Sequence, residues 1–141
     1  MDNELTQDES DARELVDFAD RLKSGGEYDE AQRGYRGAMQ LDPNWAYPVY
    51  QLACNYELSG DHNAAVAEFK RAIELGFDDF PTALGDDELG RIRDRLEFNS
   101  ELSQIRDRYL QTSKSRIGQP IAIQPDGERP PGGWPVILML H

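Results

Sequence analysis

The chain repeats itself with a period of 34 residues. When the sequence is shifted by this distance, residues 12–45 fall on residues 46–79, and the aligned side chains agree in size and polarity. The agreeing pairs are Leu15/Val49, Phe18/Leu52, Ala19/Ala53, Leu22/Tyr56, Gly26/Gly60, Ala31/Ala65, Tyr35/Phe69, Ala38/Ala72 and Leu41/Leu75. A repeat of this length and pattern is typical of helix–turn–helix units that stack side by side.

The spacing inside each unit predicts two helices. Leu15, Phe18, Ala19 and Leu22 follow the i, i+3, i+4, i+7 spacing of one apolar stripe, so we expect them to face the core. The run from Ser24 to Gly26 ends this helix, because glycine tolerates a left-handed turn. Ala31, Tyr35 and Ala38 form the stripe of a second helix, which ends near Pro43. The small alanines allow the two helices to approach closely.

These residues resemble the tetratricopeptide repeat (TPR) family over residues 12–79. The segments GEYDEAQRGYRGAMQLDPNW and GDHNAAVAEFKRAIELG each carry the turn glycine, the small alanine, the aromatic residue and the second alanine of that family's unit. The resemblance implies a solenoid of helical hairpins. It also implies the usual role of the family, which is to bind peptides in a concave groove lined by the first helix of each hairpin.

Residues 80 to about 114 do not repeat in register, but they keep a helical spacing. The apolar positions are Leu89, Ile92 and Leu96, then Phe98, Leu102, Ile105 and Tyr109. Two repeats leave an end face exposed, so we expect a divergent capping pair of helices, with Asp86, Asp87 and Glu88 capping the first of them. The predicted fold is all-α: a TPR-like helical-hairpin solenoid of two repeats and a capping pair, followed by a short C-terminal strand or hairpin tail. The predicted division is a flexible acidic tail (1–11), a helical domain (12–114) and a linker with a strand-forming tail (115–141).

The last 25 residues differ in character from the rest. Two strand-like runs, Pro120–Gln124 and Trp134–Leu140, flank a segment rich in proline and glycine. The end, PVILMLH, resembles the entry into an α/β-hydrolase of the esterase kind, which implies that any catalytic residues lie beyond His141. The chain would then be the N-terminal accessory region of an enzyme. The open alternative is a hairpin that folds back on the helices, and an exposed apolar strand also favours self-association.

The TPR resemblance places eight candidate ligand-binding residues on the first helices, off their apolar stripes. They are Arg13, Val16, Asp20, Lys23, Tyr47, Tyr50, Cys54 and Glu57. Tyr47 and Tyr50 could stack on prolines or apolar side chains, and Asp20 and Glu57 favour a basic or neutral peptide, protein or downstream domain as the partner. A structural role for both tyrosines is the alternative, and Cys54 is expected to be a small buried hydrophobe.

The charge of the chain excludes several classes of function. Acidic residues outnumber basic ones by 27 to 15, giving a net charge of -12 at a mass of 16.0 kDa. This argues against nucleic acid or an anionic membrane as a partner, since both attract clusters of Lys and Arg. Without a nucleophile or phosphate-loop motif, and with one cysteine and two histidines, we expect no catalytic residues, cofactor or metal in this chain. An N-terminus without a signal peptide favours the cytoplasm.

Overall fold

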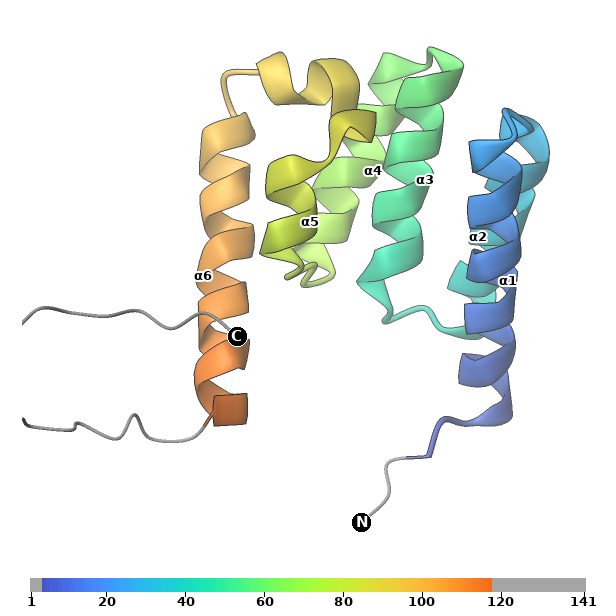
Figure 1. Ribbon diagram of the computed structural model, residues 1–141, viewed down its shortest axis with the longest axis horizontal. Helices are drawn as coiled ribbons and strands as arrows, with labels where there is room; N and C mark the ends of the chain where they lie inside the picture. The colour runs from blue at the N-terminus through green and yellow to red at the C-terminus, as the bar shows by residue number, and fades with distance from the viewer. Residues whose placement is uncertain (1–3, 118–141) are drawn as a thin grey trace, which may run out of the picture.

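The structure is a computed structural model that describes residues 4–117 (Figure 1). Within this range the chain is helical and contains no strand. The segments are α1 (Gln7–Ser24), α2 (Tyr28–Leu41), α3 (Ala46–Ser59), α4 (His62–Glu74), α5 (Phe80–Gly85), the 3₁₀ segment η1 (Asp87–Asp94) and α6 (Phe98–Ile117). Neighbouring helices pack in pairs, α1 on α2 and α3 on α4, and α2 packs on α3. The fold is therefore an all-α solenoid of helical hairpins, as predicted.

Both repeats form the expected hairpins. Each turn contains a glycine with positive φ, 82° at Gly26 and 93° at Gly60, a conformation that a side chain would strain. Asp61 caps α4 by accepting a hydrogen bond from the backbone of Ala64. The predicted glycine turns of the two units are thus confirmed.

Helix α1 begins earlier than expected. Thr6 accepts a hydrogen bond from the backbone N–H of Glu9, and the Glu9 side chain accepts one from the backbone of Thr6. This reciprocal capping box satisfies two amide groups that would otherwise lack partners, so the helix starts at Gln7. Residues 7–11, assigned above to the flexible tail, therefore belong to α1.

Two connected hydrophobic clusters hold the solenoid together. The first cluster lies mainly in the first hairpin and contains Ala12, Val16, Ala19, Ala31, Tyr35, Ala38 and Leu52. The second joins α3, α4, α5, η1 and α6, and includes Tyr50, Phe69, Phe77, Leu89, Ile92, Phe98 and Ile105. Leu52 belongs to α3 yet packs with α2, which ties the two hairpins into one array.

The apolar stripe of α1 is rotated relative to the sequence prediction. Val16 is buried, although it was expected in the groove, whereas Phe18 is 52% exposed, although it was expected in the core. Leu15 and Leu22 are only half-buried. The physical reason is position in the array: among the described residues no helix covers the outer flank of α1.

Of the two glycines inside α2, only Gly34 has a packing reason, because a side chain at Gly37 would meet just the flexible end of Leu15. A Cβ at Gly34 would lie 2.9 Å from the Cβ of Ala19, and one at Gly37 would lie 3.2 Å from Cδ1 of Leu15. Each glycine costs about 1 kcal/mol of helix propensity against alanine. At Gly34 the missing side chain allows α1 and α2 to approach closely.

The third unit caps the array but is not a regular helical hairpin. Gly90 has φ 48°, which kinks η1, and Leu96 is 97% exposed instead of buried. Leu89, Ile92 and Ile105 are buried as expected. Asp86 accepts a hydrogen bond from the backbone of Glu88, so the predicted cap is present.

Two arginines complete this capping unit. Arg93 donates to the carbonyls of Ala83, Leu84 and Asp86, and Arg95 forms a paired salt bridge with Glu101 at 3.0 and 3.1 Å. Helix α6 continues to Ile117, and the predicted strand tail at 120–140 lies outside the described residues. No helix within 4–117 is both long and apolar enough to span a membrane.

Candidate functional site

The eight candidate ligand-binding residues lie on neighbouring stripes of α1 and α3, but only some are accessible. Val16, Lys23, Tyr50 and Cys54 are buried, and the Glu57 side chain is 5% exposed. Arg13, Asp20 and Tyr47 remain half-exposed. A buried side chain cannot touch a ligand without displacing its neighbours, so the accessible part of the candidate site is smaller than the predicted stripe.

Lys23 lies at the centre of a polar network between three segments. Its ammonium donates to Oε1 of Gln51 on α3 at 2.5 Å, and it forms an ion pair with Glu88 on η1. Gln51 in turn donates to the Tyr47 hydroxyl at 2.8 Å. The lysine predicted to face a ligand therefore binds the chain's own capping segment, because η1 places a carboxylate next to it.

Asp86 contacts Tyr50 and Cys54, two further candidate residues on α3. The Tyr50 hydroxyl donates to the Asp86 carboxylate at 2.7 Å, and the Cys54 sulfur lies 3.7 Å from the same oxygen. Tyr50 also stacks on Phe77, with ring centroids 4.2 Å apart. Burial and the neighbouring carboxylate raise the pKa of the Cys54 thiol, so it stays protonated and packs as the predicted small hydrophobe.

Glu57 completes the contact of α3 with η1. Its carboxylate accepts hydrogen bonds from the backbone N–H of Arg91 at 2.8 Å and from the ring of His62, also at 2.8 Å. Burial alone would raise the pKa of this carboxyl, but the bonds from His62 and Arg91 outweigh it, and the pKa is lowered. Glu57 is thus a structural anchor for η1.

The accessible part of the site lies around Tyr47. Burial and the negative charges of Asp20 and Asp79 raise the pKa of this phenol to about 12, and Asp79 lines the same pocket as Tyr47. Asp20 also accepts a hydrogen bond from Tyr35 at 2.6 Å. The phenol of Tyr47 is therefore neutral and lies in a negative environment.

An adjacent pocket of about 360 Å³ extends this surface. Its lining comes from the α2–α3 and α4–α5 connections and the start of α3: Asn44, Trp45, Ala46, Tyr47, Leu75, Gly76, Phe77, Asp78 and Asp79. Trp45 stacks on Tyr47 with centroids 5.7 Å apart, and the Arg13 guanidinium lies 4.3 Å from the Trp45 ring centre. Trp45 and Asp79 were missed because they lie in connections, where helical periodicity carries no information; an aromatic residue just before a helix start was the available signal.

Cys54, Asp86 and Glu88 place three ligand-type atoms within 4.8 Å of one another. Asp86 already accepts bonds from Tyr50 and from the backbone of Glu88, while Glu88 is paired with Lys23. The lysine charge repels a cation at this point. The closeness of Cys54, Asp86 and Glu88 is therefore explained by their hydrogen bonds and ion pair within the chain.

Comparisons with known proteins agree with a repeat architecture. No known protein-family model matches the chain. Over 64 residues, 45% of its length, it is 36% identical to the "tetratricopeptide repeat and J domain-containing co-chaperone DNJ1" of Cryptococcus neoformans var. grubii. This relative contains tetratricopeptide repeats. Over 118 residues, 80% of its length, the chain is 24% identical to a chloroplastic protein of Arabidopsis thaliana.

The chain spans only 12% and 35% of the lengths of these two relatives. The similarity to the co-chaperone therefore supports TPR-like helical repeats, and the activities of the two whole proteins are not assigned to this chain. The predicted resemblance to an α/β-hydrolase has no support, since neither relative is named as a hydrolase and residues 118–141 lie outside the described range.

Proposed function

We propose that this chain is a non-catalytic protein-interaction module of the TPR type. The observation that carries the proposal is the pair of 34-residue helical hairpins whose first helices, α1 and α3, contact each other and carry the half-exposed Asp20 and Tyr47. Similarity to a TPR-containing co-chaperone over 64 residues supports it.

The chemistry of this surface favours a basic or neutral peptide. Tyr47 and Trp45 supply aromatic faces for apolar or proline side chains, while Asp20 and Asp79 supply negative charge. The surface opens into the 360 Å³ pocket, which has room for one side chain of a ligand. Most of the remaining α3 stripe is covered by η1, so the proposed ligand contacts are Arg13, Asp20, Tyr47 and the pocket residues.

A peptide selection tests this function. Peptides of about 12 residues, roughly the length that three or four helical turns can contact, would be selected from a random library on the full chain. We expect the selected sequences to be enriched in Lys and Arg. The double substitution Asp20→Asn and Asp79→Asn keeps both hydrogen-bond acceptors and removes two charges, and it should weaken binding about five- to tenfold.

The matched control is Asp29→Asn with Asp94→Asn, two exposed carboxylates on α2 and η1. This pair changes the net charge equally and should leave the affinity unchanged. Equal loss in both double variants would mean that net charge alone attracts the peptides, and it would contradict a site at Tyr47.

A further inference from the structure

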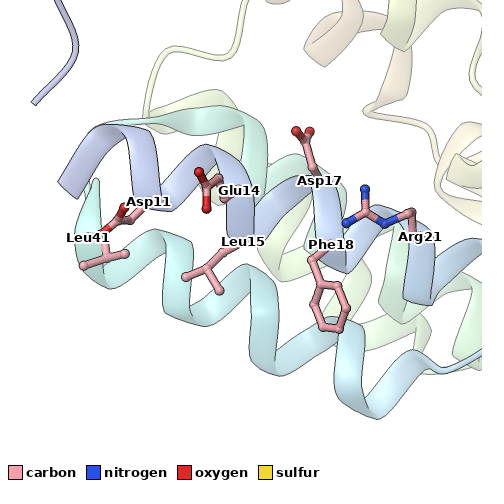
Figure 2. A pocket seen from close by; sticks show the side chains of 7 residues that line it. All are labelled: Asp11, Glu14, Leu15, Asp17, Phe18, Arg21 and Leu41. Atoms are coloured by element: carbon pink, nitrogen blue, oxygen red, sulfur yellow. The ribbon is translucent and has the colours of Figure 1, made fainter. Parts of the chain in front are cut away.

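A second surface depression among the described residues lies away from Tyr47, on the outer flank of α1 (Figure 2). It has a volume of about 680 Å³ and is lined by Asp11, Glu14, Leu15, Asp17, Phe18, Arg21 and Leu41. Leu15 and Phe18 lie along the side of α1 that faces α2, whereas the carboxylates of Glu14 and Asp17 point to its other side. We call this surface the outer α1 face.

The internal repeat shows what covers this face in the second hairpin. A shift of 34 residues places Leu15 on Val49 and Phe18 on Leu52, and both of these α3 residues are fully buried. Leu52 packs in the cluster formed by Ala31, Tyr35 and Ala38 of α2. On α3, therefore, α2 covers the position that corresponds to the exposed Phe18 of α1, while Val49 is buried in the second cluster.

The charges on the outer α1 face distinguish it from its copy on α3. Asp11, Glu14 and Asp17 align with Trp45, Pro48 and Gln51, which carry no charge. Glu14 and Asp17 are exposed, and neither has an ion-pair partner among residues 4–117. A helix lying here would therefore meet an apolar strip bordered by three carboxylates, with a single basic residue, Arg21, at one end.

This charge argues against a second copy of the chain as the occupant. A protein with a net charge of -12 that stacked outer face on outer face would bring six carboxylates together. Like charges that face each other across an interface disfavour association. A basic helix meets the same face with opposite charge.

We propose that the outer α1 face docks an amphipathic helix of a partner protein, with basic side chains beside its apolar stripe. The helix lies against α1 as α2 lies against α3. Phe18 and Leu15 enter its apolar stripe, and Asp11, Glu14 and Asp17 pair with its Lys or Arg residues. This surface is separate from the one at Tyr47, so the two interactions can be tested independently.

The test uses a synthetic amphipathic helix as the probe. Two peptides of about 18 residues would carry the same leucine stripe at i, i+3, i+4 and i+7 spacing, one with Lys and the other with Glu beside it. We expect the full chain to bind the Lys peptide, with an affinity that falls as salt is added, and to bind the Glu peptide at least about tenfold more weakly.

Substitutions on the outer α1 face test whether the Lys peptide binds there. Phe18→Ser removes an exposed side chain and should lower the affinity at least about tenfold while the chain stays folded. Glu14→Lys with Asp17→Lys should do the same. The matched control, Glu74→Lys with Asp94→Lys, makes the same charge change at exposed positions on α4 and η1 and should leave binding intact.

Backbone amide chemical shifts provide the second measurement. Shifts confined to α1 and the end of α2 support the proposal. Shifts centred on Tyr47 and Trp45, equal binding by the Phe18→Ser variant, or equal binding of the Glu peptide would each overturn it. A dimer of the free chain that Phe18→Ser dissociates would assign the face to a second copy instead.

Discussion

Tyr47 and Tyr50 lie one helical turn apart on α3, yet the structure gives them different roles. Tyr50 is fully buried, stacks on Phe77 and donates to Asp86, while Tyr47 is half-exposed beside Asp20 and Asp79. Burial and the Asp86 carboxylate raise the pKa of Tyr50, so both hydroxyls stay neutral at physiological pH. A ligand can reach only Tyr47. The structural alternative for the tyrosines therefore applies to Tyr50.

The ionisation of Glu57 should make the free energy of unfolding depend on pH in the acid range. Against the effect of burial, the folded state lowers the pKa of this carboxyl, because His62 and Arg91 donate hydrogen bonds to its charged form. A lowered folded pKa stabilises the fold above the unfolded value of about 4.3, and this contribution is lost as the pH falls through the folded pKa. Glu57→Gln should therefore cost about 1.5–3 kcal/mol at pH 7, the size of a lost hydrogen bond to a charged group.

Urea unfolding of both proteins across the acid range would measure this difference. We expect the gap between wild type and Glu57→Gln to be constant from pH 6 to 7 and to close below about pH 4. Asp29→Asn, at an exposed carboxylate, serves as the control and should show no such gap. A gap that persists in acid would mean that the Glu57 side chain acts through packing and not through its charge.

At the scale of the helix, the α1–α2 contact depends on Gly34. Alanine there would gain about 1 kcal/mol of helix propensity, but its Cβ would meet Ala19 Cβ at 2.9 Å. Overpacking costs about 1–3 kcal/mol, so Gly34→Ala should destabilise the chain by up to about 2 kcal/mol in thermal or urea unfolding. Gly37→Ala is the matched control, because it meets only the end of the Leu15 side chain at 3.2 Å, and it should be neutral or stabilising.

A double variant identifies the cause. Ala19→Gly opens space opposite Gly34, so Ala19→Gly combined with Gly34→Ala should be more stable than the sum of the two single changes predicts. Strict additivity would contradict the steric explanation.

Helical periodicity predicted α1 to α4 because each of these helices carries its own apolar stripe, and the turn inside each hairpin carries a glycine. The same reasoning missed the shape of η1, since a backbone with φ 48° at Gly90 interrupts the helical period. Reasoning from periodicity also predicted that Tyr50, Cys54 and Glu57 on α3 would be accessible to a ligand. Tyr50, Cys54 and Glu57 bind η1 instead, and this contact joins residues 32–36 positions apart. Local spacing identifies which residues share a helix face, but it does not say what that face meets.

At the scale of the whole molecule, the two ends of the described solenoid differ in how far their apolar residues are covered. The C-terminal end is closed by α5, η1 and α6, which bury Leu89, Ile92 and Ile105 against the second hairpin. At the N-terminal end Phe18 is half exposed and the depression beside it is acidic. In a stacked array each unit is stabilised mainly by its neighbours. The first hairpin, with one described neighbour, should therefore be the less stable part of the array.

Lys23 links this first hairpin to the cap, because its ammonium binds both Gln51 on α3 and Glu88 on η1. Lys23→Met keeps the length of the side chain and removes both contacts. Amide hydrogen exchange should then show protection in α1 and α2 falling about tenfold, with a smaller fall in α4, because the first hairpin opens separately. Lys70→Met, at an exposed position on α4, is the control and should leave both regions unchanged. An equal fall in all helices would show instead that the array unfolds as one cooperative unit.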